Sequence, residues 1–150
     1  MRSVIALAML LIPACGCRDQ LFRQYPTTSD AIAAGEAERG WLPVWLPDEA
    51  TDIHLQSDLD TNRSWLRFEL PPERAEKLKS SLRRVSQNDV KYVGWSRPCS
   101  ASSWWPNSLV WLDPTDDGGL NAELFFAPAD GVVLGFEQGS HRIYSWQAQN

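Results

Sequence analysis

The residue types best suited to chemistry lie in a short acidic loop near the middle of the chain. Asp58, Asp60 and Asn62 occupy the first, third and fifth positions of a calcium-binding loop pattern, and Glu69 occupies the twelfth. Against a calcium site, the sixth position holds Arg63 where such a loop needs glycine, and Glu69 falls on an expected strand rather than a helix. The pattern favours a polar hairpin loop whose Asp and Asn side chains cap their own backbone. A calcium-binding module that uses Asp58, Asp60 and Asn62 is the alternative.

Nucleophilic catalysis has a weaker basis in the sequence. The chain has two histidines, His54 and His141, and it contains neither a Gly-x-Ser-x-Gly elbow nor a phosphate-binding glycine loop. No Cys-x-x-Cys or zinc-ligand spacing occurs, and a dyad of Cys99 with either histidine requires a proximity that the sequence does not show. We therefore expect a non-catalytic protein without a cofactor. A small hydrolase that uses the acidic loop and His54 is the alternative.

Tryptophan is the strongest departure from ordinary composition, with eight residues in 150. An indole ring buries a large apolar area and keeps one N–H donor, so it serves both in cores and at binding surfaces. Several of these rings lie in or beside segments rich in proline and serine, which suits rings that grip sugars or anchor a partner protein. The alternative is that they cover the ends of a small sheet. The candidate binding residues are Trp41, Trp45, Asp58, Asp60, Asn62, Trp65, Trp104 and Trp105.

The first residues have the features of an export signal. A positively charged start, Met1–Ser3, precedes the unbroken apolar run Val4–Ile12, and Cys15 and Cys17 follow among small residues. The run is too short to span a bilayer as a helix, which takes about 20 residues. A small residue directly before a cysteine is typical of bacterial lipoprotein signals, in which the cysteine is lipidated after cleavage. We expect the lipid on Cys15, with Cys17 or an ordinary cleaved secretory signal as the alternatives.

These features indicate the bacterial cell envelope. Residues 1–14 would form the signal peptide, residues 15–28 a lipid-anchored tether and residues 29–150 the folded domain. Neither cysteine is followed by Asp, which commonly retains lipoproteins in the inner membrane, so we expect the outer membrane, facing the periplasm. The expected partners are the membrane, through the lipid, and an envelope protein or peptidoglycan. A net charge of −5 lacks the basic surface that a general nucleic-acid binder needs.

The rest of the chain predicts a single small α+β domain. Its length suits one domain, and 43% hydrophobic residues suffice for a core. Alternating apolar and polar residues predict an antiparallel sheet of about five or six strands. Five strands are predicted over residues 51–56, 64–70, 120–127, 132–138 and 141–147, and residues 90–95 and 109–112 are the candidates for a further strand.

Two helices accompany this predicted sheet. A short one over residues 28–39 would lie on the surface, with Gly40 at its end. The main helix, Pro72–Val85, would start at its prolines and lie across one face of the sheet. The apolar stripe that would pack on the sheet consists of Ala75, Leu78, Leu82 and Val85.

The segment Gly40–Leu70 resembles a set of short bacterial envelope lipoproteins. It reads Trp-Leu-Pro, then Leu-Pro-x-x-Ala-Thr-x-Ile, then Asp-x-Asp-Thr-Asn-x-x-Trp-x-x-Phe. The resemblance implies an envelope location. Because these proteins carry no assigned activity, it implies no functional residue.

The lipid anchor can be tested in expressing cells. Globomycin, which inhibits the lipoprotein signal peptidase, should cause the unprocessed form to accumulate, because cleavage before Cys15 requires that enzyme. Replacing Cys15 by Ala should abolish incorporation of radioactive palmitate, whereas Cys17→Ala should leave it intact. A mature protein that is free in the periplasm, with an unmodified N-terminus, would contradict the anchor.

Overall fold

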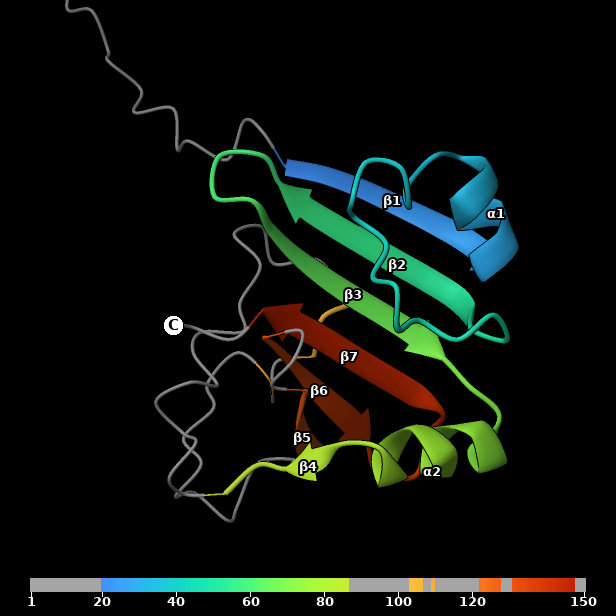
Figure 1. Cartoon of the computed structure of the whole chain (residues 1–150), viewed down its shortest axis with the longest axis vertical. Helices are drawn as coiled ribbons and strands as arrows, with labels where there is room; N and C mark the ends of the chain where they lie inside the picture. Colours follow the sequence, from blue (N-terminus) through green and yellow to red (C-terminus); the bar gives the residue numbers. More distant parts are fainter. Residues whose placement is uncertain (1–19, 87–102, 107–108, 110–121, 128–130, 148–150) are drawn as a thin grey trace, which may run out of the picture.

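The computed structural model describes residues 20–86, 103–106, 109, 122–127 and 131–147 (Figure 1). Seven strands form one antiparallel sheet in the order β1-β2-β3-β7-β6-β5-β4. The strands are β1 (Gln20–Thr27), β2 (Thr51–Asp58), β3 (Arg63–Glu69), β4 (Arg83–Arg84), β5 (Ala122–Ala127), β6 (Val132–Glu137) and β7 (Arg142–Gln147). Two short helices are α1 (Thr28–Ala33) and α2 (Pro72–Ser80). The predicted single domain with an antiparallel sheet is confirmed, and it is mostly β.

The expected tether is wrong for residues 20–27, which form strand β1 at the edge of the sheet, so the folded domain begins before residue 29. Gln20 pairs with Asp58 and Thr27 with Thr51 along β2. The strand shows no clear apolar alternation because both of its faces are partly exposed, and Pro26 resembles a loop residue although an edge strand tolerates it. Several predictions lie outside the described residues. They are the signal peptide over residues 1–14, Cys15, Cys17, Cys99, the candidate strand over 90–95, and residues 110–112 of the candidate strand over 109–112.

Both helices end earlier than the sequence predicts. The first stops at Ala33 because Gly35 adopts φ +82, which lets the backbone turn away. The second stops at Ser80, where the hydroxyls of Ser80 and Ser81 bond the carbonyls of Lys77 and Leu78, each at 2.7 Å. The residues after it leave the helix and form β4, so the predicted helix Pro72–Val85 is wrong over its last turn.

The sheet is covered on both faces. The first, which we call the cover face, packs beneath residues 34–50, which cross in front of β2 and β3 in Figure 1. Its buried residues include Leu42, Leu46, Ile53, Leu55, Leu66, Phe68, Leu134, Phe136 and Ile143, and the predicted helix residues Ala75 and Leu78 pack against it. The second, the tryptophan face, buries Trp65, Trp104, Trp105, Leu109, Val133, Tyr144 and Trp146, and Val85 packs there.

A buried carboxylate ties β1 to the segment above the cover face. Glu36 is 0% exposed, and its Oε1 accepts from the Tyr25 hydroxyl at 2.6 Å. Arg23 Nε, also from β1, lies 3.1 Å from the same oxygen, and Arg39 Nη1 lies 3.2 Å from it. A buried charge is tolerated only when it is paired and hydrogen-bonded, which these three side chains achieve.

The backbone at Glu36 then sets the path of the proline-rich segment. The Glu36 carbonyl accepts from Trp41 N at 3.0 Å and from Leu42 N at 3.2 Å. Further along, the Thr28 hydroxyl donates to the Pro47 carbonyl at 2.9 Å. Held at both ends, the segment inserts Leu42 and Leu46 into the core. Among the described residues, no helix has the length and apolar character needed to cross a membrane.

Candidate functional site

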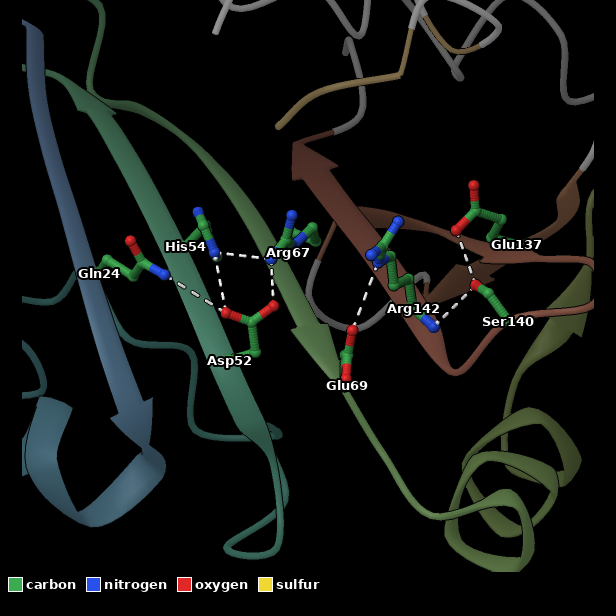
Figure 2. Close-up of polar contacts among 8 residues, drawn as sticks. All are labelled: Gln24, Asp52, His54, Arg67, Glu69, Glu137, Ser140 and Arg142. Carbon is green, nitrogen blue, oxygen red and sulfur yellow. Dashed lines mark hydrogen bonds and ion pairs between the residues drawn. The ribbon is translucent and has the colours of Figure 1, made fainter. Parts of the chain in front are cut away.

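A β-bulge in β2 creates the main polar cluster. The register slips between Thr51 and His54, so that two residues of β2, Asp52 and Ile53, oppose Phe68 of β3. Asp52 adopts φ 47, a left-handed conformation that aspartate tolerates better than most residues. A bulge of this kind redirects a side chain, and here the Asp52 carboxylate points toward His54 and Arg67 (Figure 2).

The three side chains are in direct contact. Asp52 Oδ1 lies 3.0 Å from His54 Nε2, and Asp52 Oδ2 accepts from Arg67 Nη2. Arg67 Nη2 also lies 2.6 Å from His54 Nε2, since the two residues are directly opposite on neighbouring strands. From β1, Gln24 Nε2 donates to Asp52 Oδ1 at 3.4 Å. We call these four residues the bulge cluster.

Electrostatics keep the histidine of the bulge cluster neutral. Burial lowers the pKa of His54; the hydrogen bond to Asp52 opposes this, and the charge of Arg67 reinforces it. For Asp52, burial acts to raise the pKa, but the His54 hydrogen bond and the Arg67 charge outweigh it and lower the pKa. At neutral pH the cluster therefore holds an ionised Asp52–Arg67 pair beside an uncharged imidazole.

A pocket opens next to the bulge cluster. It has a volume of about 370 Å³ and is lined by Phe22, Gln24, His54, Ser103 and Trp104. The Phe22 ring is 52% exposed, and its centroid lies 5.9 Å from those of both His54 and Trp104. Two buried nitrogens on the lining rings, His54 Nδ1 and Trp104 Nε1, have no hydrogen-bond partner among the described residues. The pocket thus combines an exposed aromatic ring with buried polar groups that are not satisfied.

The wall of this pocket is fixed by further aromatic contacts. Trp105 packs edge-on against Trp104, Tyr144 and Trp146, with centroid separations of 5.4, 5.5 and 5.9 Å. Aromatic pairs in this geometry stabilise by about 0.5–1.5 kcal/mol beyond the area that they bury. Trp104 is therefore held against the sheet rather than presented freely to solvent.

Polar contacts continue along the same face toward the end of β3 and the start of β7. Arg142 Nε lies 3.3 Å from Glu69 Oε1, and the Ser140 hydroxyl donates to Glu137 at 2.6 Å (Figure 2). Each of these charges has an opposite or hydrogen-bonding neighbour at the surface. We interpret this band as a solvated continuation of the bulge cluster.

The acidic loop forms a hairpin turn. Asp58 Oδ1 accepts from the backbone nitrogens of Asp60 and Thr61 at 3.0 and 3.1 Å, so this carboxylate caps its own backbone. Asn62 takes φ 54, which an asparagine in a turn accommodates. No group of three His, Cys, Asp or Glu side chains that could hold a metal occurs in the described part of the chain.

The structure separates the candidate tryptophans into two groups. Trp65, Trp104 and Trp105 are buried together on the tryptophan face. Trp41 and Trp45 are half-buried on the opposite face and line a second pocket of about 210 Å³. Only Trp104 of these five lines the pocket beside the bulge cluster.

Sequence reasoning missed most of the pocket and its polar neighbours. Phe22 and Gln24 went unnoticed because their strand resembles a tether. Asp52 and His54, two apart on a predicted strand, were a usable signal, with Arg67 on the next strand. The bulge that turns Asp52 toward Arg67 has no sequence signature.

The buried histidine predicts a pH dependence of stability. Because folding lowers the pKa of His54 below its value in the unfolded chain, about 6.5, the unfolded chain binds the extra proton more readily. The free energy of unfolding should fall as the pH drops below about 6.5, by at most about 1.4 kcal/mol per pH unit. Urea unfolding between pH 7.5 and 5 measures this slope, and His54→Gln should flatten it. An equal slope in wild type and His54→Gln would contradict the assignment.

One comparison with known proteins gives a match. A family model described as the YbbD head domain matches residues 19–69, which include β1, α1, β2 and β3. No curated protein and no solved structure matches the chain. Three of the five pocket residues and the whole bulge cluster lie within the matched range. Residues 19–69 are therefore similar to the YbbD head domain, and strands β4, β5, β6 and β7, outside the matched range, belong to the same sheet as β1, β2 and β3.

Proposed function

We propose that the protein is a non-catalytic binding module of the bacterial cell envelope, anchored by lipid on Cys15. Its ligand would occupy the pocket between Phe22, His54 and Trp104. One observation carries this proposal: an exposed aromatic ring borders buried ring nitrogens that have no partner among the described residues. Pockets that combine apolar walls with a few polar groups are typical ligand sites.

The chemistry of the bulge cluster favours binding over catalysis. Asp52, His54 and Ser103 are the residue types of a hydrolase triad, and His54 and Ser103 line the same pocket. A triad histidine must accept a proton during attack, and a nearby positive charge opposes that step. Arg67 Nη2 lies 2.6 Å from His54 Nε2, and the pKa of His54 is lowered, so this imidazole is a weak base.

The position of the pocket favours a protein partner over a glycan. Strand β1 is at the edge of the sheet, and within the described residues no strand pairs with its outer side. An extended peptide that adds to such an edge gains main-chain hydrogen bonds, and its alternate side chains enter neighbouring pockets. Phe22 and Gln24 belong to β1 and line the pocket, so one side chain of an added strand would reach it.

Photo-crosslinking in whole cells tests this proposal. With p-benzoylphenylalanine at position 22, we expect a covalent adduct with an envelope protein. The same probe at position 32 should give none, since Ile32 is similarly exposed, at 49%, but lies on α1. Ser103→Arg should abolish the adduct by filling the pocket, whereas Ser29→Arg, on α1, should leave it unchanged.

Three outcomes would contradict the proposal. Equal adducts at positions 22 and 32 would show that the pocket is not selective. An adduct that persists in Ser103→Arg, with an unchanged melting temperature, would place the contact elsewhere. If the protein sediments with purified peptidoglycan and gives no protein adduct, its partner is a glycan and the proposed protein partner is wrong.

A further inference from the structure

The chain enters the sheet beside an exposed hairpin. Gln20, the first residue of β1, pairs with Asp58, and Asp58 pairs with Arg63 across the β2–β3 turn. In Figure 1 the turn between β2 and β3 lies next to the start of β1. The turn presents Leu59, which is 49% exposed. The entry point of the chain therefore has an apolar side chain close to it.

A second apolar feature lies at the same end of the sheet. The pocket of about 210 Å³ on the cover face is lined by Trp41, Val44 and Trp45 and by residues at the start of β3 and β6 and the end of β7. The register places these strand ends together, since Trp65 pairs with Trp146 and Val132 with Gln147. Val44 is 97% exposed. An almost fully exposed valine between two half-buried tryptophans resembles the arrangement by which proteins contact a membrane interface.

The length of the preceding chain limits how far this end can lie from the lipid. Cys17 lies three residues before Gln20, and Cys15 lies five residues before it. Because an extended residue spans at most about 3.6 Å, the lipidated cysteine lies within about 11 Å or about 18 Å of β1. A lipid on either cysteine would thus hold this end of the sheet at the bilayer surface.

We infer that this end of the domain, with Val44 and Leu59 as its contact residues, is seated on the bilayer surface. The inference rests on the lipid anchor of the proposed function. Val44 and Leu59 enter the interface, and Trp41 and Trp45 lie at the level of the headgroups. The hairpin carries Asp60 as well as Arg63, so apolar contact and the short tether provide the attraction, and zwitterionic lipid suffices.

The opposite end of the sheet supplies a matched control. Helix α1 follows Thr27 at the far end of β1, and its Ile32 is 49% exposed, the same fraction as Leu59. A probe at position 32 therefore has comparable access to water but lies away from the anchor. Positions 32 and 59 lie at opposite ends of the sheet, and the experiment compares these two ends.

Depth-dependent fluorescence quenching measures the seating. The full lipidated protein, with a fluorescent amino acid at position 44, 59 or 32, is reconstituted into phosphatidylcholine and phosphatidylethanolamine vesicles that contain nitroxide-labelled lipid. We expect quenching of about twofold or more at positions 44 and 59, because the contact residues reach the boundary of the acyl chains, and none at position 32. Matching melting temperatures confirm that all three labelled proteins are folded.

The possible failures are distinguishable. Mass spectrometry of the purified protein reports the lipid independently of the quenching. A lipidated protein with equal quenching at the three positions, or with stronger quenching at position 32, would overturn the seating and leave the anchor intact. A protein without lipid on Cys15 or Cys17 would overturn both.

Discussion

The buried carboxylate of Glu36 is the interaction on which the rest of the structure depends. It is fully buried and is balanced by Arg23 and Tyr25 of β1 and by Arg39 of its own segment. Burial and the bond to Glu36 raise the pKa of Tyr25, so the phenol keeps the proton that it donates. Because the same residue's carbonyl accepts from the Trp41 and Leu42 nitrogens, one residue fixes both the edge strand and its cover. The two surfaces for which we propose contacts, at Phe22 and at Val44, are positioned by these bonds.

The opposite face shows how a polar group can be built into a small sheet. The Asp52–Arg67 pair loses hydration on burial, and such pairs stabilise a fold only when their geometry is good. The bulge supplies that geometry by turning Asp52 toward Arg67, and the neutral His54 fills the remaining space without adding charge. The rings of Trp104 and Trp105 cover part of this face. The buried nitrogens His54 Nδ1 and Trp104 Nε1 then lie next to the pocket at Phe22. Structure and proposed binding are linked here because the same rings complete the core and border the pocket.

The sequence predicted an element where the residues of that element determine its structure. It failed where the structure depends on contacts with other elements. Strands β2 and β3 alternate apolar and polar residues, and β5, β6 and β7 lie between turn residues, so all five were predicted with small errors at their ends. Strand β1 was missed because an edge strand exposed on both faces has no strong alternation. The end of α2 depended on two serine hydroxyls that compete for helix carbonyls, and the bulge cluster depended on a register shift. Trp104 and Trp105 were identified by type, but their separation from Trp41 and Trp45 follows from which face each segment covers.

The most direct test of the role of Glu36 compares two neighbouring glutamates. Glu36 is buried among cations, whereas Glu38 is exposed two residues later. Urea unfolding should show that Glu36→Ala loses about 1–3 kcal/mol, because the half-buried Tyr25 hydroxyl and Arg23 guanidinium then lack their partner. Glu38→Ala should change stability by no more than about 0.5 kcal/mol. Hydrogen exchange of the β1 amides should also accelerate in Glu36→Ala alone. Equal stability and equal β1 exchange in the two variants would contradict the view that this carboxylate fixes the edge strand and its cover.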